Sequence, residues 1–160
     1  MHFNPTAMKR IAFVFLSLFL LWGCSKEAMV ELVSISDTGC AREEPVTKSG
    51  ENTGSQLILK YSPAGLVITR TNAVMNCSIK NGGIGCNVTN TGNTINFEVY
   101  ELGEPLRCTC PVETMIAVLA GLRPGREYVL DYNCGGSFAP ISFTYDKDLN
   151  LVIDLSLYML

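Results

Sequence analysis

Residues 94–100 read Thr-Ile-Asn-Phe-Glu-Val-Tyr, so that apolar and polar side chains alternate along the stretch. A period of two places the apolar side chains on one face of an extended chain, which predicts a half-buried β-strand. An apolar stretch at 84–88 precedes it, and the segment 89–93 between the two contains a glycine. Two such stretches joined by a glycine-containing turn predict a β-hairpin.

The same arrangement recurs on both sides of this hairpin. Short turns rich in Pro, Gly or Asp separate further apolar stretches at 62–65, 121–125 and 146–148. Residues 113–122 have two apolar faces and alone could form a short helix, but the following turn and partner strand favour a central strand. The expected strands are 29–36, 56–61, 66–74, 84–88, 94–100, 114–120, 127–133, 141–145 and 149–155. This pattern predicts an all-β fold, an antiparallel sandwich of about 7–9 strands.

The lengths of the connections predict two different ends for this sandwich. If successive strands run antiparallel, all four tight turns lie at one end, together with the start of the first strand. The longer loops then lie at the opposite end; they are 37–55, 75–83, 101–110 and 134–139. Loops carried on a rigid sandwich are where such folds usually place recognition. We therefore expect a loop end that faces away from the start of the first strand.

Residues 121–130 read Gly-Leu-Arg-Pro-Gly-Arg-Glu-Tyr-Val-Leu. In Leu122, Pro124, Gly125 and Tyr128 this segment resembles the fibronectin type III signature at the corner between the fifth and sixth strands of that family. The resemblance implies an immunoglobulin/fibronectin type III-like sandwich in which the Tyr128 hydroxyl bonds to backbone near Leu122. Together with Met75-Asn76-Cys77 and Cys108-Thr109-Cys110, this segment also resembles small cysteine-rich bacterial lipoproteins of unknown function, and that resemblance implies no activity.

Six cysteines lie in or beside the longer loops. They are Cys40, Cys77, Cys86, Cys108, Cys110 and Cys134. An even number in an exported chain predicts up to three structural disulfides, although the sequence leaves their pairing open. Cys108 and Cys110, two residues apart, could instead hold a metal or form a redox site. We favour the structural interpretation, and no metal ligand set is predicted.

The N-terminal residues have the features of an export signal. Lys9 and Arg10 precede an apolar run over 11–22, which is short for a membrane span and has the length of a signal-peptide core. The following Leu21-Trp22-Gly23-Cys24 resembles a lipobox, which implies cleavage before Cys24 and lipid attachment to it. We expect a lipoprotein signal peptide at 1–23, a lipid-anchored tether at 24–28 and one β-sandwich domain at 29–160. Ser25 after the lipidated cysteine favours the outer membrane of the cell envelope.

Composition limits the chemistry that the exported chain could perform. The formal net charge of the chain is −3, and loss of Lys9 and Arg10 makes the remainder more acidic. An acidic chain without basic clusters argues against a nucleic-acid partner. The only histidine is residue 2, which leaves with the signal peptide, so no imidazole is available as a general base or metal ligand. The only expected cofactor is the covalent lipid on Cys24.

One short motif is compatible with an enzyme. Asp37-Thr38-Gly39 matches the catalytic loop of aspartic proteases, in which two aspartates share a proton and activate water. A chain of this length would need a dimer to supply the second aspartate. The competing interpretation is a turn, with Asp37 at the end of the first strand, exposed to solvent and bonded to nearby backbone amides.

These observations favour a non-catalytic function over catalysis. The leading expectation is a membrane-anchored binding or structural module that recognises an unknown protein or glycan through its loop end. The second is a protease inhibitor that presents the loop 102–107. A dimeric aspartic-protease-like enzyme that uses Asp37 is third.

Overall fold

The computed structural model describes residues 29–40, 54–76, 82–104, 107, 109–136 and 139–155. Within these ranges the chain forms nine strands and no α-helix. The strands are β1 (Glu31–Asp37), β2 (Gln56–Ser62), β3 (Gly65–Asn76), β4 (Ile84–Thr91), β5 (Thr94–Glu101), β6 (Thr109–Ala120), β7 (Arg126–Cys134), β8 (Ile141–Tyr145) and β9 (Asn150–Asp154). The proposed signal peptide, Cys24 and the tether lie outside the described residues.

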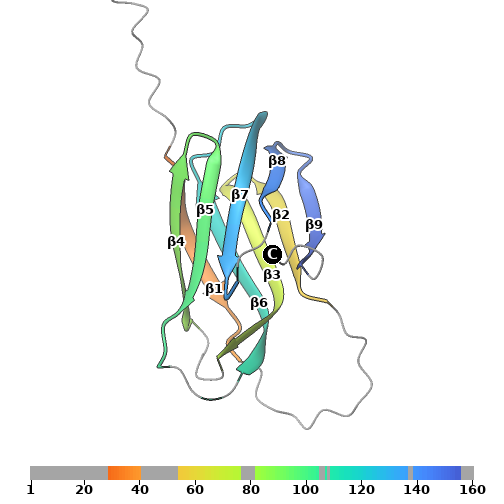
Figure 1. Cartoon of the computed structure of the whole chain (residues 1–160). Coiled ribbons are helices and arrows are strands. Elements are labelled where there is room, and N and C mark those ends of the chain that lie inside the picture. Colours follow the sequence, from red (N-terminus) through yellow and green to blue (C-terminus); the bar gives the residue numbers. More distant parts are fainter. Residues whose placement is uncertain are drawn as a thin grey trace, which may run out of the picture.

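The strands form two sheets that face each other (Figure 1). One sheet has five strands in the order β1-β6-β3-β2-β9, and the other has four in the order β4-β5-β7-β8. The all-β, two-sheet prediction is therefore confirmed. The stretch with two apolar faces belongs to β6, which lies between β1 and β3 and is a strand rather than a helix.

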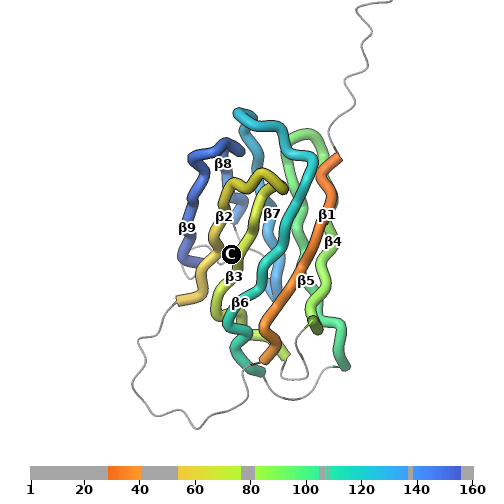
Figure 2. Tube along the Cα trace, turned by 180° about the vertical axis from the view of Figure 1, so that it is seen from behind, coloured from red at the N-terminus to blue at the C-terminus, as the bar shows by residue number. Residues whose placement is uncertain are grey.

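Nine strands run alternately down and up the molecule, and this places the connections as predicted. The four tight turns and the start of β1 lie at one end, and the strand ends that flank the longer connections lie at the other, which is called the loop end below. Both the front view and the view from behind show this arrangement (Figures 1 and 2).

The pairing of β5 with β7 departs from the predicted antiparallel pattern. Residues Ile95 and Leu130 are opposite each other in a parallel ladder that runs from Thr94 to Val99 on β5. The reason is that β6, which returns the chain between them, pairs with β1 and β3 in the other sheet. Since alternate strands run in the same direction, removing the intermediate strand leaves two parallel neighbours. The other strand pairs are antiparallel.

The core lies between the inner faces of the two sheets. On β5 the alternation seen in the sequence is confirmed, because Ile95, Phe97 and Val99 are buried. Phe97 stacks against Tyr132 on β7, with ring centroids 5.9 Å apart. Along one side the sheets approach each other, where the Val30 amide donates to Asn90 Oδ1 at 2.9 Å. Burial of such aromatic and aliphatic side chains is the main favourable contribution to folding.

The turn between β6 and β7 contains the corner expected from the fibronectin-like segment. Tyr128 is 4% exposed, and its hydroxyl oxygen accepts a hydrogen bond from the Arg123 amide, next to Leu122. Gly125 has a φ of 76° and Gly121 a φ of 90°, conformations that favour glycine. A side chain at position 121 would also collide with the Met29 carbonyl, so this glycine lets the start of the domain pass close to the turn.

Candidate functional site

A disulfide between Cys40 and Cys110 joins two neighbouring segments at the loop end. The two Cα atoms are 5.7 Å apart, and 70 residues of sequence separate the cysteines. Cys40 lies beyond the end of β1, where residue 40 forms an isolated bridge with Val112 of β6. Cys110 lies near the start of β6, opposite Met75 of β3. The predicted structural role is therefore realised at these two positions, which are joined in a disulfide.

Asp37 ends β1 and connects it to the loop before β4. Its Oδ1 accepts hydrogen bonds from the Gly39 amide at 2.8 Å and from the Gly82 amide at 3.2 Å. This is the backbone-bonded turn that was predicted as the alternative to a catalytic aspartate. The expected solvent exposure was wrong, however, because Asp37 is only 7% exposed. The chain from Gly82 passes over the carboxylate, so the turn is formed by two loops rather than one.

Further bonds hold the ends of β3 and β5 at the same end of the molecule. Glu101 Oε1 accepts a hydrogen bond from the Asn76 amide at 2.7 Å. The Asn76 carbonyl oxygen in turn lies 3.3 Å from Cys40 Sγ and 3.8 Å from Cys110 Sγ. The Leu102 amide donates to the Gly83 carbonyl at 2.9 Å. The described parts of these loops are thus tied to one another and to the strand ends.

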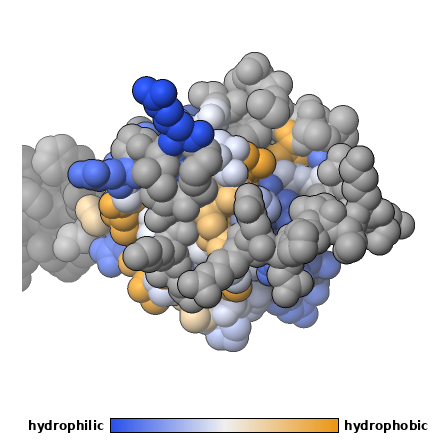
Figure 3. Space-filling model, turned by 90° about the horizontal axis from the view of Figure 1, so that it is seen from below, coloured by the Kyte–Doolittle hydropathy of each residue, from blue (hydrophilic) through white to orange (hydrophobic). Residues whose placement is uncertain are grey.

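Two large apolar side chains are exposed at this end. Val74 on β3 is 72% exposed, and Leu102, directly after β5, is 61% exposed. Viewed from below, the loop end shows hydrophobic side chains among polar ones (Figure 3). Leu102 begins the loop 102–107 that was predicted as a possible inhibitor loop, of which residues 105 and 106 lie outside the described residues. Exposed apolar side chains whose backbone is held in place can contribute to a binding surface.

Two of the predicted disulfide cysteines are free thiols in the structure. Cys86 on β4 and Cys134 on β7 are both opposite Val99 of β5, on either side of it. Two strand spacings place their Cα atoms about 10 Å apart, beyond the roughly 7 Å that a disulfide can bridge. β5 therefore keeps these two cysteines from pairing with each other, and both are free thiols here, whereas the cysteine count had predicted that they are disulfide-bonded. Cys77 and Cys108 lie outside the described residues.

A buried polar group between the sheets was not anticipated from the sequence. Arg70 on β3 is 6% exposed, and its guanidinium carbon lies 5.7 Å from the centre of the Tyr132 ring. Tyr132 is fully buried, and burial raises the pKa of its hydroxyl well above 10.0; the nearby Cys134 adds to this rise and Arg70 opposes it. Burial likewise raises the pKa of the Cys134 thiol. Contact with the face of an aromatic ring stabilises a cation such as the Arg70 guanidinium where water is excluded.

The sequence contains a charged residue, Arg70, within an apolar strand, but this pattern has two interpretations. Arg70 occupies an inward position in β3, between Ile68 and Asn72, whose φ is 51°. A charged residue at an apolar-face position usually indicates either a wrong strand register or a buried polar contact. Only the three-dimensional position of Tyr132, more than sixty residues later, distinguishes the two.

The described residues contain no cluster of three or more His, Cys, Asp or Glu side chains that could hold a metal ion. The same part of the chain includes no helix long and apolar enough to cross a membrane. Comparison of the chain with protein-family models, with curated proteins and with solved structures finds no match. The two facing sheets and the disulfide at the loop end define the class of protein: a disulfide-containing β-sandwich.

Proposed function

We propose that this chain is an envelope-anchored lipoprotein whose β-sandwich is a non-catalytic binding module. In this proposal the lipid on Cys24 attaches it to a membrane, most suitably the outer membrane, and residues 24–28 act as the tether. The domain is of the immunoglobulin/fibronectin type III kind, and the partner is a protein or a glycan. Because β1 starts at the tight-turn end, the loop end points away from the anchor.

One observation at the loop end carries the binding proposal. Val74 and Leu102 present exposed apolar surface, while the Cys40–Cys110 disulfide and the hydrogen bonds of Asp37 fix the backbone around them. A surface that is ordered before binding loses less conformational entropy when a partner docks. Apolar side chains at the centre of such a surface supply much of the binding energy. This combination supports recognition better than it supports a purely structural module.

The anchor is tested by replacing Cys24 with serine. The proposal expects Cys24→Ser to abolish labelling by a fatty-acid probe and to leave an uncleaved precursor. Wild-type labelling is the positive control, and a Ser25→Ala variant, which leaves the cysteine in place, should be labelled as the wild type is. Unchanged labelling of Cys24→Ser would overturn the lipoprotein assignment.

The binding surface is tested by affinity capture from native envelopes with the oxidised chain lacking residues 1–24. A double variant, Val74→Ser with Leu102→Ser, is expected to lose the captured partner. The control is Ile116→Ser with Val152→Ser, which removes exposed apolar side chains (38% and 52% exposed) from the outer face of the five-stranded sheet. Equal capture by the loop-end variant and the wild type would place the binding surface elsewhere.

A protease inhibitor is the second candidate, and Leu102 is the observation that favours it. Its backbone amide donates a hydrogen bond to the Gly83 carbonyl, which fixes the start of the loop, while its apolar side chain is exposed to solvent. Such a loop can occupy the apolar specificity pocket of a protease. Dose-dependent inhibition of a chymotrypsin-like protease that is lost in Leu102→Asp would support this candidate over general binding.

A further inference from the structure

The outer face of the four-stranded sheet is mostly polar and carries acidic but no basic side chains. Its positions follow from strand alternation, because the residues between them point toward the other sheet and are buried or partly buried. They are Gly85, Asn87, Thr89, Thr91, Thr94, Asn96, Glu98, Tyr100, Glu127, Val129, Asp131, Asn133, Ser142 and Thr144. Three of these are acidic and none is Lys or Arg. We call this surface the acidic face.

An aromatic ring is fixed on this face by a glycine. Tyr100 of β5 is paired with Gly85 of β4, and a Cβ atom at position 85 would lie only 2.5 Å from Tyr100 Cε2 and 2.7 Å from Cζ. The ring therefore lies across the backbone of Gly85, which is buried although it faces outward. Tyr100 itself remains 47% exposed. An aromatic side chain held against the sheet in this way presents its face to solvent at little entropic cost.

Two carboxylates lie next to this ring along the sheet. Glu98 is two residues from Tyr100 on the same face of β5, and it is opposite Asn87 and Asn133. Asp131 of β7 is opposite Asn96. Strand geometry puts the Cα atoms of Glu98 and Asp131 about 8 Å apart. Asn96, Phe97, Glu98, Asp131 and Asn133 together line a shallow hollow of about 250 Å³.

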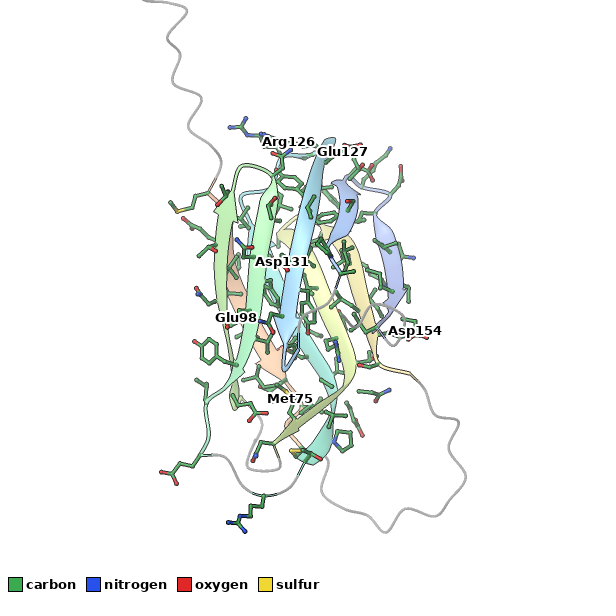
Figure 4. All side chains as sticks on the ribbon, viewed as in Figure 1. Met75, Glu98, Arg126, Glu127, Asp131 and Asp154 are labelled. Carbon is green, nitrogen blue, oxygen red and sulfur yellow. A yellow bond between two sulfur atoms is a disulfide. The ribbon has the colours of Figure 1, made fainter. Side chains whose placement is uncertain are left out.

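The basic residue of β7, Arg126, does not lie beside this hollow. Glu98 and Asp131 are on the middle parts of β5 and β7, whereas Arg126 lies at the tight-turn end of the molecule (Figure 4). Two like charges on one sheet face, without a basic side chain at any neighbouring outward position, repel each other. A cation bound between them would remove that repulsion.

We propose that the acidic face docks a basic peptide segment of a partner protein. A Lys or Arg side chain of the segment lies over the Tyr100 ring, with its charge beside Glu98, and a second basic residue meets Asp131. The electron-rich face of a tyrosine ring attracts cations, and the two carboxylates supply the complementary charge. The side-chain amides of Asn87 and Asn133 have donors and acceptors for the backbone of the segment. This inference is independent of the loop-end proposal.

The test uses the oxidised exported chain and a fluorescent hexa-arginine peptide as the probe, with binding followed by anisotropy. The double variant Glu98→Gln with Asp131→Asn is expected to bind about tenfold more weakly, since each tenfold change corresponds to about 1.4 kcal/mol. The matched control is Glu113→Gln with Asp148→Asn, which has the same net charge but removes carboxylates outside the acidic face. Its affinity should stay within about twofold of the wild type.

The aromatic contribution is measured separately. Tyr100→Phe keeps the ring and should bind like the wild type, whereas Tyr100→Ser should bind about two- to fivefold more weakly. Thermal unfolding of each variant, with Tms close to that of the wild type, shows that the sheet is intact.

Three results would overturn the proposal. Equal losses in the two double variants would mean that hexa-arginine responds to net charge alone. An undetectable interaction with the wild type would exclude a basic segment. Binding of neutral cellohexaose that Tyr100→Ser abolishes, without binding of hexa-arginine, would assign the face to a glycan instead.

Discussion

The hydroxyl oxygen of Tyr128 accepts a hydrogen bond from the backbone amide of Arg123, five residues earlier, at a distance of 2.9 Å. The bond connects β7 to the turn that brings the chain from one sheet to the other. The Tyr128 ring also stacks on Phe143 of β8, with centroids 5.9 Å apart. One side chain thus joins the turn to the core of the four-stranded sheet.

Tyr128→Phe should therefore lower the free energy of unfolding by about 1–3 kcal/mol, because the ring remains while the Arg123 amide loses its partner. Urea denaturation followed by circular dichroism measures the change. Tyr100→Phe is the control, since removal of an exposed hydroxyl should alter stability by less than about 0.5 kcal/mol. A Tyr128→Phe variant as stable as the wild type would show that the corner bond contributes nothing.

Peptide mapping of the oxidised protein should find Cys40 linked to Cys110. Alkylation in urea without reductant should label Cys86 and Cys134, which the structure shows as free thiols. In the native protein the same labelling should be slow, because burial shields these thiols and raises their pKa, so that less thiolate forms. Complete protection of Cys86 and Cys134 in urea would mean that both are disulfide-bonded, as the cysteine count alone had suggested.

Removal of the Cys40–Cys110 link has a separate expected cost. Cys40→Ala with Cys110→Ala frees a closed segment of 70 residues, and should lower the free energy of unfolding by about 3–4 kcal/mol. The control is Cys86→Ala, which removes a cysteine without opening that segment and should cost distinctly less.

Stability should fall as the solution becomes alkaline. The Cys134 thiol has a pKa above 9.0 in the folded chain, because of burial, and close to 9.0 in the unfolded chain. Below about pH 9 both states keep the proton, so the full stability is present. As the pH rises further, the unfolded chain loses this proton first, and the free energy of unfolding decreases until the folded thiol also ionises. Denaturation curves at a series of pH values measure this slope.

Cys134→Ala should make the alkaline slope shallower. Cys86→Ala should have a smaller effect, because Cys86 is less buried than Cys134. An unchanged slope in Cys134→Ala would assign the alkaline loss of stability to other groups, of which the buried Tyr132 hydroxyl is the first candidate.

Asp37→Asn should cost less than about 1 kcal/mol, because an amide oxygen can still accept the bonds from Gly39 and Gly82. Asp37→Ala loses both bonds and should cost about 2–3 kcal/mol. Degradation of unfolded casein by wild type and Asp37→Asn, at acidic and neutral pH, tests the catalytic alternative. Casein cleavage by the wild type that disappears in the variant would favour the aspartic-protease hypothesis.

The strands were predictable from the sequence because each depends on local patterning. The alternation of Ile95, Phe97 and Val99 with polar residues defines β5, and the Pro-Gly and Asp-rich turns bound its neighbours. Turn lengths also sufficed to place all tight turns at one end. Which strands pair with one another could not be predicted in the same way. Nothing in the local sequence of β7 indicates that it pairs in parallel with β5 rather than with β6.

The candidate sites were only partly predictable for the same reason. The motif at Asp37 indicated a turn, but its burial depends on Gly82, which comes 45 residues later. Cys40 and Cys110 were both candidates for a disulfide, yet only the position of β1 beside β6 selects this pair. The Tyr100 ring on Gly85 could have been suspected from the hairpin register, in which the two residues face each other.

The parallel contact between β5 and β7 has a consequence for how this chain reaches its native state. A hairpin can form alone, but a parallel pair requires the chain to travel back along the molecule before the second strand is in position. Here the returning strand is β6, at the interior of the opposite sheet. The pairing of β5 with β7 therefore brings together two strands that the whole of β6 separates in the sequence. We expect slow, all-or-none folding, in which hydrogen exchange of the β5 and β6 amides reports the same global opening.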